Sequence, residues 1–257
     1  MPGVYFCGIV EKKMLADGIF QFTVFGGEMA REARAGQFLH IRCGGERILR
    51  RPISIAGVMA DSCLVTFVID TVGAGTKWLA GREIGDTLDI LGPLGRGFDL
   101  PSGSFAVVGG GVGVPPLLFA ACCAEGGVTA VLGFRDENKM MLVDDFEAVC
   151  DKVFVTTDNG GYGIHGTVMQ PLERLLKDGR HGAVGAVLTC GPHAMMSAVA
   201  KLCRQFGILC QASLEERMGC GVGACLVCAC KTVSGGIERM SHVCKDGPVF
   251  DAAEVVW

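Results

Sequence analysis

Several features that mark common classes of protein are missing from this 257-residue chain. It has no basic run and no alternation of basic and aromatic residues, and its net charge is −4, so we expect no nucleic-acid partner. No charged segment followed by an apolar one begins the sequence, so we expect no signal peptide. The five histidines are scattered, and no Ser/His/Asp arrangement or carboxylate pair is present. The chain therefore has no recognisable acid–base site for a carbon substrate.

One uncharged stretch, residues 105–124, is long enough to cross a bilayer. It is interrupted by glycines and prolines, which favour a strand, a turn and a helix over one continuous helix. The interrupting residues are Gly109, Gly110, Gly111, Gly113, Pro115 and Pro116. We therefore expect no membrane span.

The cysteines form one distinctive pattern near the C-terminal end of the chain. Three follow the spacing C-x4-C-x2-C, and a fourth comes after 15 further residues; the four are Cys220, Cys225, Cys228 and Cys244. The triplet has the spacing of a plant-type [2Fe–2S] site. Gly219, Gly221 and Gly223 favour positive φ angles and a closely wrapped loop, whose amides point at the sulfides. We therefore expect these thiols to bind a [2Fe–2S] cluster.

Zinc binding and chance are the alternatives to a cluster for these cysteines. A structural zinc site normally uses two C-x2-C pairs, whereas this loop contains one. Chance enters because the chain has 14 cysteines and many lie in apolar runs as small core residues. Cys230 is a nearby fifth thiol that would share a face with Cys228 in an extended segment. Cys230 is thus the one thiol that could replace one of the four as a ligand. We interpret it as a bystander that binds no iron.

The cysteine content also bears on the location of the protein. Fourteen cysteines in a chain of this size do not resemble a disulfide framework. A cluster held by thiolates must stay reduced, which is the condition of the cytosol. We therefore expect a cytoplasmic protein.

The hydrophobic pattern predicts a multi-domain β plus α/β chain. Residues 1–99 contain β-rich runs at 4–10, 18–24, 37–41, 53–56, 64–69 and 87–91, which predict a small antiparallel barrel. Residues 100–214 alternate strands and helices, which predicts a doubly wound parallel sheet. Its expected strands are 105–108, 128–133, 153–156, 184–189 and 211–214, and its expected helices are 115–124, 141–149, 167–177 and 192–206. Residues 215–257 are too few for a core of their own, so we expect the cluster to hold them together.

Two motifs in the barrel region suit a cofactor that contains a diphosphate. Arg51-Pro52-Ile53-Ser54 offers the guanidinium fork of Arg51 to the phosphates and one hydroxyl to a flavin ring edge. The simpler interpretation is a surface arginine beside a strand. Gly75-Thr76 belongs to a glycine turn just before a short helix at 77–79, where backbone amides bind phosphate well.

Two further turns are expected at carboxyl ends of strands in the parallel sheet, where ligands of such sheets bind. The first follows a strand and opens a helix, as a dinucleotide-binding turn does, although Pro116 replaces the last glycine of the full motif. The second closes a later strand. The residues concerned are Gly109, Gly110, Gly111, Gly113 and Pro115 in the first turn, and Cys190, Gly191 and Pro192 in the second. A purely structural turn is the alternative for the first.

The choice between the two nicotinamide dinucleotides is open at this point. Asp136, after the second expected strand, would prefer a free ribose hydroxyl and therefore NAD. Its neighbour Arg135 would accept a 2′-phosphate and therefore NADP.

The order of these motifs resembles the ferredoxin-reductase superfamily. Within it, three segments are similar to the electron-transfer subunit of dihydroorotate dehydrogenase type B. They are Arg51-Pro52-Ile53-Ser54, Gly75-Thr76-Lys77-Trp78-Leu79 and Val243-Cys244-Lys245-Asp246-Gly247-Pro248-Val249-Phe250. The resemblance covers essentially the whole chain, and the cysteine loop and the last of these segments are its most specific parts.

The resemblance implies FAD in the barrel, NAD on the second domain and a [2Fe–2S] cluster in the tail. It also implies a partner catalytic subunit that carries FMN and converts dihydroorotate to orotate in pyrimidine biosynthesis, in a heterotetramer of two of each chain. Val68-Ile69-Asp70 matches a segment that touches FAD mainly through its backbone. Ile53 stands where the superfamily usually has an aromatic residue, and Asp70 where a basic one is common.

Two alternative functions stand beside this interpretation. One is a subunit with the same cofactors that serves an NAD(P)H–ferredoxin or sulfide-dehydrogenase-type reductase. The other, from a different class, is a non-enzymatic flavoprotein scaffold or sensor held together by zinc.

Overall fold

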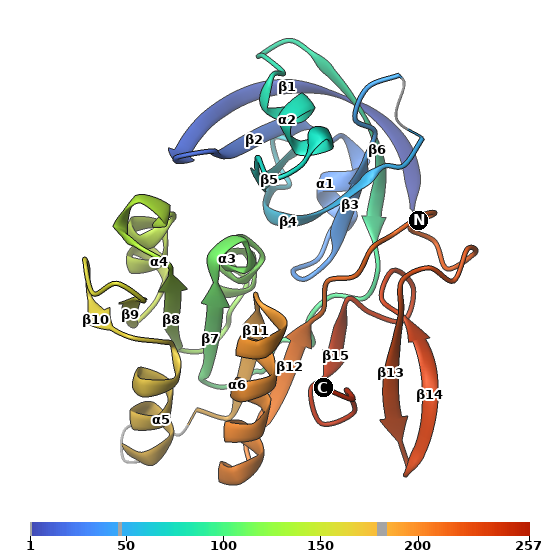
Figure 1. Ribbon diagram of the computed structural model, residues 1–257. Helices are drawn as coiled ribbons and strands as arrows, with labels where there is room; N and C mark the ends of the chain where they lie inside the picture. The colour runs from blue at the N-terminus through green and yellow to red at the C-terminus, as the bar shows by residue number, and fades with distance from the viewer. Residues whose placement is uncertain (1, 46–47, 179–183) are drawn as a thin grey trace.

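The computed structural model describes residues 2–45, 48–178 and 184–257. Figure 1 shows a β-barrel above a sheet that is flanked by helices, with a two-stranded hairpin beside the sheet. The barrel and the sheet confirm the predicted antiparallel barrel followed by a doubly wound α/β unit.

The barrel is closed by strands in the order β1-β2-β5-β4-β3-β6. Its strands are β1 (Gly3–Ala16), β2 (Ile19–Phe25), β3 (Phe38–Ile41), β4 (Arg51–Met59), β5 (Leu64–Asp70) and β6 (Thr87–Leu94). Each expected run corresponds to one of these strands. The rings of Phe22 and Phe67 stack in the core with centroids 5.5 Å apart. Two short helices, α1 (Glu28–Glu32) and α2 (Ala74–Ala80), complete the barrel, and α1 was not expected from the sequence.

The second unit is a seven-stranded sheet with the order β10-β9-β8-β7-β11-β12-β15. Its strands are β7 (Phe105–Gly110), β8 (Val128–Phe134), β9 (Lys152–Thr157), β10 (Ile164–His165), β11 (Ala186–Cys190), β12 (Leu209–Ser213) and β15 (Val249–Asp251). The order reverses between β7 and β11, which is the point where open α/β sheets bind ligands.

The helices of this unit cover both faces of the sheet (Figure 1). They are η1 (Gly111–Gly113), α3 (Val114–Cys122), η2 (Glu137–Lys139), α4 (Val143–Val149), α5 (Met169–Asp178) and α6 (His193–Phe206). The stretch 105–124 is therefore strand, turn and helix, as expected. Within the described ranges, no helix is both long and apolar enough to cross a membrane.

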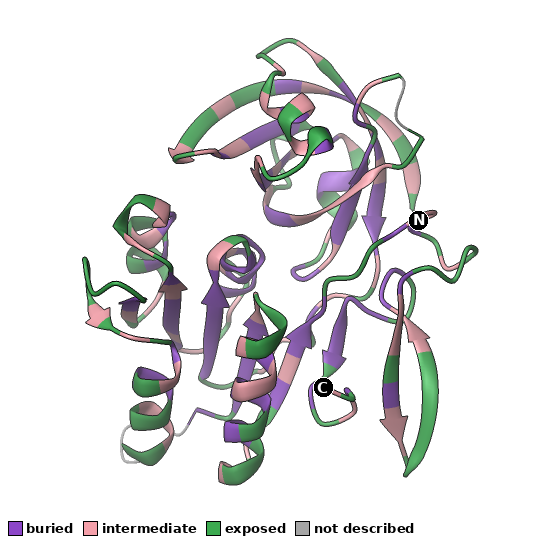
Figure 2. Cartoon of the chain, in the orientation of Figure 1, coloured by how far each residue is buried: buried purple, intermediate pink, exposed green. Residues whose placement is uncertain are grey.

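The two faces of the sheet belong to two different cores. Phe105 and Val107 of β7 share a buried cluster with the barrel, whereas Ala106 and Val108 share one with the tail. This alternation follows from the two-residue period of a strand. Figure 2 shows the buried residues running through the central strands and on into the tail. The sheet thus connects the barrel to the tail through continuous apolar packing.

The tail is more closely joined to the sheet than the sequence suggests. Its hairpin consists of β13 (Ala229–Ser234) and β14 (Ile237–His242), but its last strand, β15, pairs antiparallel with β12. Phe250 and Val243 are buried in the core that the tail shares with the sheet. Packing therefore holds these residues in addition to any cluster. The division into 1–99, 100–214 and 215–257 remains a proposal based on the order of motifs.

Candidate functional site

A cleft of about 1060 Å³ lies between the barrel and the sheet, at the carboxyl ends of β7 and β11. Every predicted cofactor-binding residue lines it except Gly75 and Gly109. Those that line it are Arg51, Pro52, Ile53, Ser54, Val68, Ile69, Asp70, Thr76, Gly110, Gly111, Gly113, Pro115, Cys190, Gly191 and Pro192. Ordinary small-molecule sites have about 300–1,000 Å³. The cleft is therefore large enough for extended nucleotide cofactors.

Arg51 is held at the edge of this cleft by its surroundings. Its Nη1 donates a hydrogen bond to the backbone oxygen of Leu49 at 2.6 Å. A Cβ atom on Gly75 would lie 2.5 Å from Nε of Arg51, so a larger residue would displace the guanidinium. Gly75 thus contributes indirectly, by leaving room for Arg51. The arrangement suits a diphosphate, which matches the forked donors of arginine.

The glycines of the turn after β7 have different roles. A Cβ atom on Gly113 would lie 2.3 Å from the oxygen of Cys190, and one on Gly110 would lie 2.7 Å from Sδ of Met195. These two glycines let the turns after β7 and β11 approach each other. Gly111 has a φ of +51° and no atom within 4 Å of its Cβ position, so it faces open space in the cleft. Gly111 is the glycine that leaves room for a ligand.

Cys190 ends β11 at the floor of the cleft. Burial raises the pKa of its thiol to about 12, although a hydrogen bond with Ser213 opposes the shift. The thiol is therefore neutral at physiological pH. Cys190 therefore adds no charge to this part of the cleft.

The predicted nucleotide-selecting residues separate in the structure. The side chain of Asp136 accepts a hydrogen bond from the backbone N–H of Asn138 at 3.0 Å and caps η2. Asp136 is not part of the cleft lining, whereas Arg135 and Lys139 are. Lys139 also donates to the backbone oxygen of Asp17 at 2.6 Å, which links the sheet to the barrel. Of the two candidate residues, Arg135 is the one that lines the cleft.

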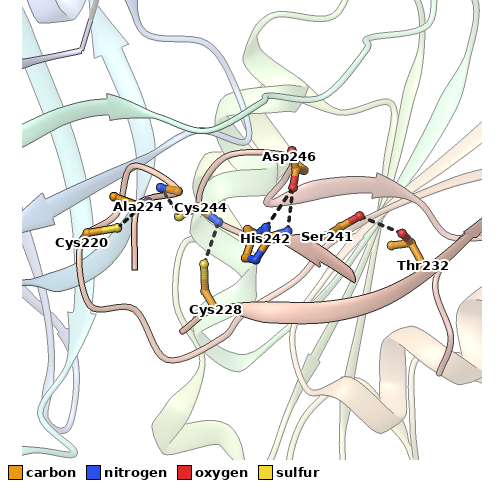
Figure 3. A network of polar contacts seen from close by, with 9 residues as sticks. Cys220, Ala224, Cys228, Thr232, Ser241, His242, Cys244 and Asp246 are labelled. Atoms are coloured by element: carbon orange, nitrogen blue, oxygen red, sulfur yellow. Dashed lines mark hydrogen bonds and ion pairs between the residues drawn. The ribbon is translucent and has the colours of Figure 1, made fainter. Parts of the chain in front are cut away.

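The four predicted metal-binding cysteines lie near one another in the tail, and Figure 3 shows three of them, Cys220, Cys228 and Cys244. They form two pairs: the N–H of Cys220 donates to Sγ of Cys225 at 3.3 Å, and the N–H of Cys244 donates to Sγ of Cys228 at 3.4 Å. A [2Fe–2S] cluster uses two thiolates on each iron, and the pairing fits that requirement. Among the described residues, no three metal-binding side chains converge on one point as a single tetrahedral ion requires.

Backbone amides of the loop surround these sulfur atoms. Sγ of Cys220 accepts hydrogen bonds from several loop amides, and Sγ of Cys244 accepts one from Gly223 at 3.1 Å. The donors to Cys220 are Val222 at 3.4 Å, Ala224 at 3.2 Å and Cys225 at 3.4 Å. Hydrogen bonds to ligand sulfurs stabilise the negative charge of an iron–sulfur centre. The loop is therefore built to receive an anionic cluster.

The loop backbone confirms part of the prediction made from its glycines. Gly221 and Gly223 have φ angles of +76° and +81°, as expected. Gly219 does not adopt a positive φ, so that expectation was wrong; a Cβ atom there would lie 3.0 Å from Sγ of Cys225. Leu226 has a φ of +60° and is 58% exposed, which the sequence did not indicate. Left-handed leucine is uncommon and is found where surroundings enforce it.

The amides also change the acidity of the ligand thiols. Burial opposes ionisation of Cys220, but the N–H groups of Val222, Cys225 and Ala224 outweigh it and lower the pKa to about 6. Burial raises the pKa of Cys230 to about 11 and that of Cys244 to about 12, so thiol acidity does not separate these two residues. Cys230 accepts none of the loop-amide bonds described above, and it lines the cleft instead. The lack of loop-amide bonds supports its interpretation as a bystander.

His242 is occupied by a turn rather than by the thiols. Its backbone N–H donates to Oδ2 of Asp246 at 2.7 Å, and its Nδ1 lies 3.6 Å from the same oxygen (Figure 3). His242 is therefore part of the turn that contains Asp246.

Sequence reasoning missed one residue of the site, His40 in β3. It is fully buried, and the backbone of the cysteine loop lies against its ring. Burial and the nearby charge of Arg50 lower the pKa of His40 to about 4, so the imidazole is neutral at physiological pH. The one available signal was a histidine inside an otherwise apolar strand.

Comparisons with known proteins agree with this description. Residues 215–256 match a family model described as the iron–sulfur cluster binding domain of dihydroorotate dehydrogenase B. The chain is 37% identical, over 100% of both chains, to the dihydroorotate dehydrogenase B (NAD(+)) electron transfer subunit of Desulforamulus reducens. It is 38% identical to that of Bacillus pumilus, over 96% of both chains.

A solved structure is similar over the whole chain. It is described as an NADH-dependent reduced ferredoxin–NADP oxidoreductase that carries out flavin-based electron bifurcation. The TM-score is 0.88 at 33% identity, and the match covers 100% of this chain and 92% of the other.

The paired thiols give a prediction about the ligands. Replacing Cys220, Cys225, Cys228 or Cys244 by serine should abolish the paramagnetic signal of the reduced protein or shift it strongly, because each removes one of four thiolates. The matched control is Cys230→Ser, which should leave the signal nearly unchanged. Loss of the signal in Cys230→Ser together with its survival in Cys244→Ser would show that the assignment is wrong.

The position of Arg51 gives a prediction about flavin affinity. Arg51→Ala should weaken FAD binding by roughly ten- to a hundredfold, because a charge-assisted contact of this kind contributes about 1.5–3 kcal/mol. Flavin content after dialysis and a fluorescence titration would measure the loss. Arg42→Ala is the control, since Arg42 is exposed and lies 3.8 Å from Asp89 on another strand. Unchanged affinity in Arg51→Ala would contradict the assignment.

Proposed function

The chain belongs to the family of dihydroorotate dehydrogenase B electron transfer subunits, and we propose which of its residues hold each cofactor. It is an oxidoreductase subunit that uses FAD, a [2Fe–2S] cluster and NAD. Its function is to carry electrons between a catalytic subunit and NAD. Nicotinamide exchanges electrons in hydride pairs, an iron–sulfur cluster exchanges one at a time, and a flavin does both.

The observation that carries this assignment is the position of the thiol pairs relative to the cleft. Met218, just before the cysteine loop, and Cys230, just after it, both line the cleft that also contains Arg51 and Gly111. Three segments far apart in the sequence therefore meet around one cavity. Donors suited to a diphosphate and an open glycine turn line the cleft, and the segments on either side of the cysteine loop reach the same cleft.

Each group of residues has a proposed role. Arg51 holds the FAD diphosphate, Ser54 faces the flavin ring, and the backbone of β5 from Val68 to Asp70 forms the opposite wall. The turns at Gly111 and Gly191 accept NAD. The cluster is held by the two thiol pairs described above. This distribution gives a flavin domain, a nucleotide domain and a cluster domain in the order of the chain.

The chemistry of the carbon substrate is assigned to the partner. Oxidation of dihydroorotate to orotate releases two electrons and two protons, and NAD⁺ takes up two electrons and one proton, so one proton is released overall. We propose that the partner catalytic subunit carries FMN, that two copies of each chain assemble, and that the assembly is cytoplasmic. Val222, Leu226 and Val227 are exposed around Cys225, which suits a cluster at an interface.

A second candidate function is supported by the solved structure that matches the whole chain. A subunit with these same parts can deliver electrons to a ferredoxin-linked partner in place of a dihydroorotate enzyme. The two candidates differ in the protein that binds the chain, so co-purification followed by assays with dihydroorotate and with ferredoxin distinguishes them.

The open space at Gly111 gives a prediction about NADH. Gly111→Val places a branched side chain in the cleft, so reduction of the bound flavin by NADH should become at least tenfold slower at equal FAD content. Stopped-flow absorbance at the flavin band measures this rate.

Valine at a positive φ is also strained, and a matched control separates the two effects. Gly207 has a φ of +67° and no atom within 4 Å of its Cβ position, but it lies outside the cleft at the end of α6. Gly207→Val should destabilise the fold modestly and leave NADH reduction unchanged. Normal NADH reduction in Gly111→Val would mean that the turn is structural.

The assignment of the carbon chemistry to the partner is tested by separating the two proteins. The isolated chain should pass electrons from NADH to artificial acceptors but should not oxidise dihydroorotate. Adding the catalytic subunit should restore dihydroorotate-dependent reduction of NAD, and cysteine variants without the cluster should not support it. Oxidation of dihydroorotate by the chain alone, or equal NAD reduction by the catalytic subunit alone, would refute the proposal.

A further inference from the structure

His40 occupies an unusual place in the barrel. It lies in the short strand β3, opposite Pro52 of β4, and its side chain is fully buried. Its backbone oxygen accepts a hydrogen bond from Nη1 of Arg50, which also forms an ion pair with Asp89 at 2.7 Å. The backbone of His40 is therefore fixed by β4 and β6, and its ring has a defined position.

The ring of His40 is in contact with the cysteine loop. A Cβ atom on Gly221 would lie 2.6 Å from Nδ1 of His40, so the loop backbone touches the imidazole edge. Gly221 follows Cys220 directly, and the backbone of Cys220 is close enough to the ring to favour its protonated form. The barrel thus contacts the loop beside one of the proposed cluster ligands.

The polar atoms of this ring have no fully formed hydrogen bond in the structure. Neither Nδ1 nor Nε2 of His40 reaches a partner with normal geometry among the described residues. A neutral imidazole carries one N–H donor, and burying such a donor without a partner is unfavourable. Buried polar groups in native proteins nearly always have a partner, and the backbone of Cys220 is the group of the cysteine loop that interacts with this ring.

His40 also lies directly beside the flavin-binding strand. It pairs with Pro52, which comes between Arg51 and Ile53 in the proposed FAD motif. A chain of contacts therefore joins the cysteine loop to the proposed FAD motif. Gly221, next to Cys220, touches the ring of His40, and the backbone of His40 pairs with Pro52 of β4. Electron transfer between two fixed centres depends on the distance that such contacts maintain.

Building on the proposed function, we infer that His40 is a positioning residue for electron transfer between flavin and cluster. Its ring N–H donates a hydrogen bond to the backbone oxygen of Cys220 in the loaded loop and holds that loop against β3. The residue touches neither dihydroorotate nor NAD. Its contribution is to keep the loop in the conformation in which the cluster and the flavin exchange electrons.

Two substitutions separate hydrogen bonding from simple filling of space. His40→Leu keeps an apolar side chain of similar size but has no donor, whereas His40→Gln keeps an N–H donor. In purified holoprotein, NADH should reduce the flavin at the wild-type rate in both variants. Reduction of the cluster should become about tenfold slower in His40→Leu, as loss of one hydrogen bond to a seated loop implies, and should largely recover in His40→Gln.

The reduced cluster provides a second readout that does not depend on turnover. Its paramagnetic spectrum in His40→Leu should show broadened or additional components from loop conformers that are not seated, and His40→Gln should restore the wild-type spectrum. The control is Thr23→Val on β2, which lies across the barrel from β3; it removes hydrogen bonds to Glu11 of β1 and Thr66 of β5. This variant should leave both the rate and the spectrum unchanged.

The outcomes distinguish this inference from the proposed function. If wild-type cluster is reduced by NADH and His40→Leu matches it in rate and spectrum, the role of His40 is refuted while the proposed function stands. If cluster reduction is slowed equally in His40→Leu and His40→Gln, the N–H donor of the ring is not what matters, and the proposed hydrogen bond is refuted. Wild-type protein whose cluster is not reduced by NADH would overturn both.

Discussion

The constraint on which the structure depends is the need to direct four thiols and several backbone amides at one small region. The loop can do so because Gly221 and Gly223 adopt positive φ angles, which turn consecutive N–H groups toward Cys220 and Cys244. A loop wound this tightly has little core of its own. It has to be attached to rigid neighbours, and β12 before it and β15 after it provide them by pairing with each other.

A second constraint is that backbone segments approach each other closely, and this requires glycine at several positions. Gly113 allows the turn after β7 to meet the turn after β11, and Gly95 allows the end of the barrel to meet Pro248 of the tail. In both places a side chain would collide with backbone or with proline, so these glycines serve the fold. Gly111 alone among the glycines of the first turn faces open space at a positive φ, which separates ligand binding from packing.

Much of this arrangement was predictable because its signals are local. The alternation of short β runs and the strand–turn–helix stretch at 105–124 depend on neighbouring residues, and the structure confirms both. The cysteine spacing is equally local; its four thiols form two hydrogen-bonded pairs, and their role as cluster ligands stays a prediction. The features that the sequence analysis missed depend on residues that are far apart in the sequence. Pairing of Gln211 with Asp251 and contact between His40 and Gly221 join segments far apart in the sequence, and no local pattern specifies them. The capping bond from Asn138 to Asp136 is, by contrast, a local contact that the sequence analysis did not anticipate.

The links among the three parts give the molecule a fixed internal geometry. The N–H of Asp99 donates to Oε1 of Gln211 at 2.9 Å, Nε2 of Gln211 returns a bond to Asp99 at 2.7 Å, and the N–H of Arg96 donates to Gly247. The segment between barrel and sheet is thereby tied to β12 and to the tail. Transfer of single electrons moves no atoms of the protein, so a rigid frame that fixes distances is sufficient for it. A hydride acceptor, by contrast, must enter and leave, and the open cleft between the barrel and the sheet allows that exchange.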